Sequence, residues 1–132
     1  MYKHTQIFLV LVLIILSGCS RTNKLPAGSD MQKFDSIVWQ NESSIKSKNN
    51  SISAREKMLK DLVENVLPNK TKNEIEDLLG KSLETVYFKS IDKDMVYYLG
   101  PQRDSFMNID SEWLLIWLDD SGKFKDYRVV ND

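Results

Sequence analysis

Apolar positions between residues 51 and 80 recur at helical spacing and predict two short helices. The first carries an apolar stripe at Met58, Leu59, Leu62, Val63, Val66 and Leu67. Ser53 and Glu56 have capping-box spacing at its start, and Pro68 stops it, since proline lacks an amide donor and clashes with the preceding turn. The second helix begins at a capping box of Thr71 and Glu74 and ends at Gly80. The pattern therefore predicts a helical hairpin joined by "LPNK".

Beyond Gly80 the period changes from 3.6 to 2, which predicts strands. Four segments are rich in aromatic and β-branched residues and bounded by turn formers: "SLETVYFKS" (82–90), "DMVYYLG" (94–100), "SEWLLIWLDD" (111–120) and "KFKDYRVV" (123–130). Short connections favour antiparallel pairing, and both helices must cover one sheet face to bury their stripes. The expected fold is therefore an α+β two-layer sandwich of order α-α-β-β-β-β over residues 51–132, with the hairpin packed on a four-stranded antiparallel sheet.

The start of the chain has the layout of an export signal. Lys3 precedes a ten-residue apolar run, Ile7 to Leu16, which is too short to span a bilayer comfortably. Residues 16–19, "LSGC", resemble the lipobox of bacterial lipoproteins. That resemblance implies that residues 1–18 are a signal peptide and that Cys19 is the lipid attachment site. The alternatives are an uncleaved anchor, or an ordinary signal in which the cysteine is incidental.

Composition narrows the chemistry. The chain has one cysteine, Cys19, and one histidine, His4, which signal cleavage would remove. Histidine triads, cysteine nucleophiles and His/Cys zinc sites would then lack their essential groups. We therefore expect no catalytic residues, no metal ligands and no cofactor.

The lipobox resemblance makes Cys19 the lipidated start of residues 19–50. The abundance of Ser, Asn, Lys and Gln in these residues predicts a flexible tether. One more apolar stretch, Met31 to Trp39, is expected to dock on the domain or on a partner. Residues 51–132 carry twelve basic and sixteen acidic side chains without a basic stripe, which argues against nucleic acid as a partner.

The helix with "REKM…DL", the "LPNKTKNEIEDLLG" hairpin, the "MVYYLG" strand and "WLLIWLDDSGK" together resemble the SmpA/OmlA-type (BamE-like) small outer-membrane lipoproteins. The same α-α-β arrangement recurs in the β-lactamase inhibitor protein repeat. The resemblance implies a lipid-anchored, non-catalytic module that serves outer-membrane assembly or maintenance. Unlike members of this family, the chain has no Gly-rich sequence before the second helix and no proline soon after the Leu-Gly at the end of that helix.

Strand parity separates a candidate binding face from the core. In residues 111–118, Leu114, Ile116 and Leu118 suit the helix-covered face, whereas Trp113 and Trp117 fall on the other. The expected open face comprises Tyr87, Tyr98, Trp113, Trp117 and Arg128, with Phe124 on the same parity as Arg128. Exposed aromatics and arginine are typical of a binding surface. The alternatives are that Met31 to Trp39 folds over this face, or that these residues complete the core.

Two further features lie in the connections that flank the predicted strands. The long connection between residues 100 and 110 carries Arg103 and Phe106, which we expect either to contact a partner or to form a mobile tip. Asp92/Asp94, Asp110/Glu112 and Asp119/Asp120 flank the predicted strands and lack calcium-loop spacing, so they read as turn formers.

The sequence thus predicts a protein-binding module held in the bacterial cell envelope through lipid on Cys19, with an envelope protein of unknown identity as its partner. Ser20 in place of Asp after the cysteine favours the outer membrane, facing the periplasm. One alternative is an inhibitor or immunity lipoprotein that blocks an enzyme. A carboxylate-based envelope hydrolase is a more distant alternative.

Overall fold

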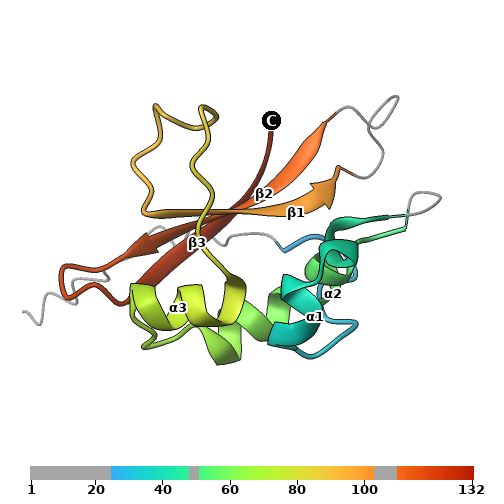
Figure 1. The fold of residues 1–132 in the computed structure, drawn as a ribbon, viewed down its shortest axis with the longest axis horizontal. Coiled ribbons are helices and arrows are strands. Elements are labelled where there is room, and N and C mark those ends of the chain that lie inside the picture. The colour runs from blue at the N-terminus through green and yellow to red at the C-terminus, as the bar shows by residue number, and fades with distance from the viewer. Residues whose placement is uncertain (1–24, 48–50, 103–109) are drawn as a thin grey trace, which may run out of the picture.

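A computed structural model describes residues 25–47, 51–102 and 110–132. Helical elements precede the strands, in the order α1 (Ser36–Gln40), η1 (Glu42–Ile45), α2 (Ala54–Asp61), η2 (Leu62–Val66), α3 (Lys72–Leu79), β1 (Met95–Pro101), β2 (Ser111–Leu118) and β3 (Phe124–Asn131). The strands form an antiparallel sheet of order β1-β2-β3. Helices lie against one face of this sheet, and an irregular segment crosses the other (Figure 1). The α+β class is therefore confirmed.

The helical hairpin follows its capping signals. Thr71 and Glu74 form a complete capping box at the start of α3, and Gly80 ends that helix with φ of +86°. Ser53 Oγ accepts from the Glu56 amide at 3.1 Å and donates to the Leu99 carbonyl at 2.6 Å. The cap of α2 thus also fastens that helix to β1. After Asp61 the helix continues through a π-helical turn, η2, to Val66.

The prediction of a fourth strand at residues 82–90 is wrong. Pairing reaches only the start of this segment, where the Leu83 amide donates to the Val96 carbonyl at 3.0 Å and the Val96 amide donates to Ser82 Oγ at 2.9 Å. The chain then leaves the sheet edge, and Phe88 and Ile91 pack against the sheet face opposite the helices. Burial of these two side chains on that face outweighs the β propensity of the local sequence.

Two apolar clusters lie on opposite sides of the sheet. The larger one joins the helices to the inward residues of the strands and includes Tyr97, Leu99, Leu114 and Ile116. The smaller one is centred on Val96, Trp113 and Leu115. The predicted parity of residues 111–118 is therefore correct.

Phe124 lies on the other face from the one expected. The β2–β3 register shifts between Trp117 and Leu118, which pair with Asp126 and Phe124 respectively. This irregularity leaves one extra residue, Lys125, in β3 and turns Phe124 toward the helix-side core, while Arg128 keeps its predicted face.

Residues 25–47 pack on the domain, which corrects the prediction of a flexible tether for this part of residues 19–50. Trp39 is 0% exposed in the helix-side core, and Leu25 and Phe34 pack against the same cluster. Arg55 donates from Nε to the Trp39 carbonyl at 3.0 Å, and its guanidinium lies 4.9 Å from the Trp39 ring centroid. The segment is polar overall, and this low mean hydropathy led the sequence prediction to overlook its few large apolar residues that pack on the core.

Backbone bonds hold the same segment along α2. The Gln32 amide donates to the Lys57 carbonyl at 3.1 Å, and the Lys60 amide donates to the Ser29 carbonyl at 3.0 Å. The Phe34 amide donates to Asp61 Oδ2 at 2.8 Å, and this bond, with a second from Asn65, lowers the pKa of Asp61 below its ordinary value. Met31 to Trp39 thus docks on the domain, as one alternative held, but on the helix side.

Within the described residues, no helix is long and apolar enough to cross a membrane. The predicted signal peptide and Cys19 lie outside the described residues.

Candidate protein-binding surface

Trp113 is the centre of an aromatic cluster on the sheet face opposite the helices. The ring centroid of Tyr98, on β1, lies 5.0 Å from that of Trp113 in an edge-on arrangement. The rings of Phe88 and Tyr87 lie 6.0 and 6.1 Å from it. Separations of this size are typical of favourable aromatic pairs. Four of the chain's aromatic side chains therefore meet at one point of the sheet.

The two tryptophans of this face are each fixed by a hydrogen bond from the indole. Trp113 Nε1 donates to Asp132 Oδ2 at 3.2 Å, and Trp117 Nε1 donates to the carbonyl of Asp92. The guanidinium carbon of Arg128 lies 5.4 Å from the Trp117 ring centroid, which is cation–π geometry. Sequence parity had placed Tyr98, Trp113, Trp117 and Arg128 on one face, and the structure brings them together there.

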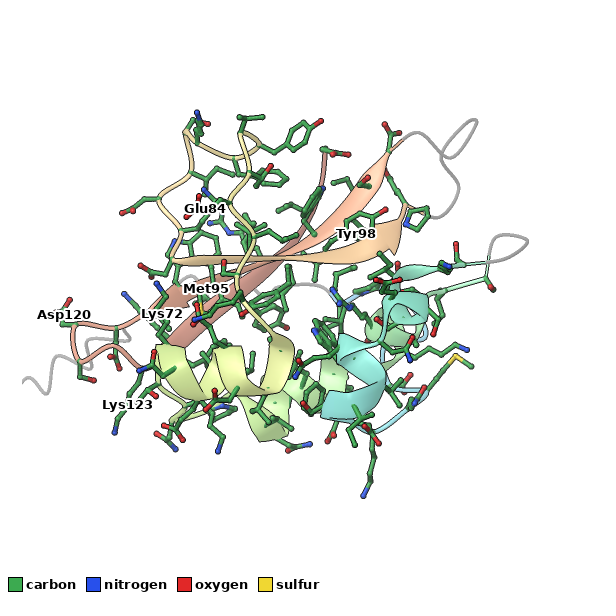
Figure 2. All side chains as sticks on the ribbon, viewed as in Figure 1. Lys72, Glu84, Met95, Tyr98, Asp120 and Lys123 are labelled. Carbon is green, nitrogen blue, oxygen red and sulfur yellow. The ribbon has the colours of Figure 1, made fainter. Side chains whose placement is uncertain are left out.

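This face is not bare. Residues 81–94, which we call the covering segment, cross it above β1 and β2 (Figure 1). In Figure 2, Glu84 on the covering segment lies on one side of the sheet, and Lys72 on α3 lies on the other. Trp113 is consequently only 9% exposed. The alternative in which Met31 to Trp39 folds over this face is wrong, because that segment lies against the helix-side core.

The covering segment is pinned at both ends. At its start, Ser82 and Leu83 bond to Val96, and near its end the Asp94 amide donates to the Ile116 carbonyl at 3.0 Å. Asp94 Oδ2 also accepts from the Leu118 amide at 2.7 Å. Between these anchors the main chain turns sharply, with the Ile91 amide donating to the Phe88 carbonyl at 2.9 Å.

Phe88 occupies the left-handed region, with φ of +63°. A bulky aromatic residue rarely adopts this conformation, which costs on the order of 1–2 kcal/mol. The contacts of its ring with Trp113 and Tyr87 offset that strain. Lys93 Nζ donates to the Phe88 carbonyl at 2.9 Å and fixes the turn further. The strained turn thus positions the residues just before it.

Three large residues of the covering segment before this turn, Leu83, Val86 and Tyr87, are exposed, and we group them as the apolar patch. Their exposed fractions are 47%, 71% and 52%, although all three are large apolar or aromatic side chains. Sequence reasoning identified Tyr87 but did not single out Leu83 or Val86, and it placed all three in a strand that the structure does not contain. Only the course of the main chain after Ser82 reveals them.

The surroundings of the patch are polar and mixed in charge. A groove of about 580 Å³ runs beside Leu83 and is lined by charged residues of both signs, including Lys81, Lys93, Glu76 and Glu84. Lys81 is paired with Glu76 at 3.0 Å on the surface. A smaller hollow of about 330 Å³ lies between Trp117, Arg128 and Asp92. The exposed apolar side chains are therefore rimmed by polar ones, as is common in protein interfaces.

Of the acidic pairs, Asp119 acts as a turn group in the β2–β3 connection, whereas Glu112 lies buried within β2. Asp119 Oδ1 accepts from the Ser121 hydroxyl at 2.7 Å, the Ser121 amide at 2.9 Å and the Lys123 amide at 3.0 Å. The hydroxyl bond, followed by the Lys123 amide bond, lowers the pKa of Asp119 below its ordinary value. Across the described ranges, no group of three or more His, Cys, Asp or Glu side chains is placed to hold a metal ion.

Three predicted site residues, Cys19, Arg103 and Phe106, lie outside the described residues. Comparison of the chain with protein-family models, with curated proteins and with solved structures finds no match.

Proposed function

We propose that the chain is a lipid-anchored, non-catalytic protein-binding module of the bacterial cell envelope, and that the apolar patch makes its main contact. The supporting observation is the exposure of Leu83, Val86 and Tyr87 on a segment that well-packed aromatics hold in place. A rigidly supported apolar group with a polar rim is the usual anatomy of a protein interface. Tyr98 and Arg128, both half-buried beside the covering segment, extend this surface.

The anchor in this proposal is lipid on Cys19, which the lipobox-like "LSGC" supports. An exported protein with a single cysteine has no partner for an intramolecular disulfide, and a thioether-linked lipid accounts for that cysteine. The resemblance to SmpA/OmlA-type lipoproteins adds a role in outer-membrane assembly or maintenance, on the periplasmic side.

Photocrosslinking in intact cells tests the contact. A photoreactive residue is placed at Val86, and a matched control carries the same residue at Ile37, which is 85% exposed on α1. We expect a discrete crosslinked protein from position 86 and none from position 37. Equal crosslinking from both positions, or none from either, would contradict the proposed surface.

Purification under native conditions separates this function from enzyme inhibition. Stable recovery with a membrane-bound envelope complex supports the proposal, whereas recovery with a single soluble enzyme that loses activity when bound would assign the chain to the inhibitor class instead.

A further inference from the structure

Arg128 on β3 is held in one orientation on the sheet face that carries the covering segment. Its guanidinium carbon lies 5.4 Å from the centroid of the Trp117 ring, and Trp117 is itself fixed because its Nε1 donates to the Asp92 carbonyl. Within the described ranges, the Arg128 side chain makes no hydrogen bond or ion pair with another residue. An arginine stacked on an aromatic ring keeps the N–H donors along its edge available to a further group.

The lysines beside the apolar patch differ from Arg128 in this respect. Lys81 Nζ pairs with Glu76 Oε2 at 3.0 Å, and Lys93 Nζ donates to the Phe88 carbonyl at 2.9 Å. Each lysine therefore keeps an acceptor from its own chain when a partner displaces the surrounding water. Arg128 does not, so the partner must supply one.

Arg128 lies within the area that a partner on the apolar patch would cover. Val96, Leu115 and Arg128 pair in one row across the sheet, and the Leu83 amide donates to the Val96 carbonyl at 3.0 Å. Neighbouring strands lie about 4.8 Å apart, so roughly 15 Å separates the main chain of Leu83 from that of Arg128. An interface of ordinary size covers about 800 Å² of each protein, which is a disc roughly 30 Å across. One partner would therefore cover both residues.

A hollow of about 330 Å³ beside Arg128 has room for a side chain of the partner. Lys125, Asp92 and Asp126 also line it, and the Asp126 carboxylate accepts from the Tyr127 amide at 2.8 Å. Because charges of both signs line the hollow, long-range attraction does not select its occupant. Direct contact with the N–H groups of Arg128 does.

We propose that the partner inserts an Asp or Glu side chain into this hollow and that its carboxylate binds the Arg128 guanidinium. This rests on the protein-binding function proposed above and adds the chemistry of the partner at this point. Covering the guanidinium without an acceptor would bury an unpaired charge, which is strongly unfavourable. A carboxylate matches the fork of guanidinium donors with two parallel hydrogen bonds. The Trp117 ring already orders that fork, so binding costs little side-chain entropy.

Two matched charge removals test the contact. Full-length chains carry the photoreactive residue at Val86 together with Arg128→Gln or, as the control, Lys123→Gln, and the crosslinked partner is quantified from intact cells. Figure 2 shows Lys123 at one extreme of the molecule, away from Glu84 on the covering segment. We expect Arg128→Gln to lower the yield at least about tenfold and Lys123→Gln to change it less than about twofold. Thermal melts of both variants confirm that the domain is folded.

Carbodiimide coupling identifies the acceptor. Arg128→Lys places a primary amine beside the hollow, and a water-soluble carbodiimide joins an amine to a carboxylate in direct contact, forming an amide. Mass spectrometry should then find position 128 linked to an Asp or Glu of the protein that is captured from Val86.

The outcomes separate this inference from the function on which it rests. Capture from Val86 that is equal in Arg128→Gln and Lys123→Gln, or that occurs without any link from position 128 to an acidic residue of the captured protein, overturns the carboxylate contact and leaves the binding function intact. Absence of capture from Val86 in the chain that carries no other substitution contradicts the binding function itself.

Discussion

Replacing Trp39 by alanine tests whether residues 25–47 belong to the folded domain. Trp39 is 0% exposed, its ring lies 6.0 Å from that of Phe34, and the Arg55 guanidinium lies 4.9 Å from its centroid. Truncating a buried tryptophan to alanine costs about 3–5 kcal/mol, from lost burial and the cavity left behind. Loss of the Arg55–Trp39 contact adds to this cost, since burial already lowers the pKa of Arg55 by disfavouring its charge.

A loss of this size is a large fraction of the stability of a small domain, which is typically about 5–15 kcal/mol. Urea unfolding of the chain from Ser20 onward, followed by circular dichroism, measures it. Ile37→Ala is the matched control on the same helix, because Ile37 is exposed and its truncation should change stability by less than about 0.5 kcal/mol. If Trp39→Ala also costs less than about 1 kcal/mol, residues 25–47 contribute little to the fold, and their assignment to the folded domain is wrong.

Three further predictions follow from single contacts. Thr71→Ala should destabilise the domain by about 1 kcal/mol in thermal melts, because it removes the N-terminal cap of α3. Thr71→Ser keeps the hydroxyl and is the control, with a melting temperature unchanged from wild type. An unchanged melting temperature for Thr71→Ala would contradict the role of the cap. Phe88→Ala should increase acrylamide quenching of tryptophan fluorescence, since the Phe88 ring covers Trp113; unchanged quenching would mean that the covering segment does not shield it. The pKa of Asp61 is lowered in the folded state, so Asp61 stabilises the domain above the ordinary carboxylate pKa and loses this effect as the pH falls through its folded-state pKa. Asp61→Asn should therefore reduce the loss of stability at acidic pH in a stability–pH profile. An unchanged acidic part of the profile would refute this.

The helices were predictable because their signals are local. A capping box, an apolar stripe and a stop at proline or glycine involve residues within a few positions of one another, and Thr71, Glu74 and Gly80 act as expected. The faces of β2 were predictable for the same reason, since alternation is a property of the strand itself.

The errors arose where distant contacts decide the outcome. Residues 82–90 alternate like a strand, but packing of Phe88 and Ile91 on Trp113 and Leu115 draws them off the sheet edge. Residues 25–47 are polar overall, yet Trp39 is fully buried in the core, and Leu25, Phe34 and Val38 pack against the same cluster. The bulge that turns Phe124 inward depends on the pairing of β3 with β2, which alternation alone does not specify.

The candidate surface was predictable in part. Tyr98, Trp113, Trp117 and Arg128 share a face as parity indicated, but the exposed apolar residues of that region come mainly from the covering segment. Whether a side chain on a sheet face is exposed depends on what crosses that face, which is a tertiary property.

The most direct test of the central claim compares partner recovery by two matched charge substitutions in exposed apolar positions. Val86→Asp lies in the apolar patch, and Ile37→Asp lies on α1, on the helix side of the sheet; both side chains are mostly exposed, so neither change should unfold the domain. Tagged, full-length variants are purified from detergent-solubilised envelopes, and the protein crosslinked from position 86 is quantified in each. The proposed function predicts that Val86→Asp loses this partner while Ile37→Asp retains it. Equal recovery by both variants would contradict the assignment of the patch as the binding surface.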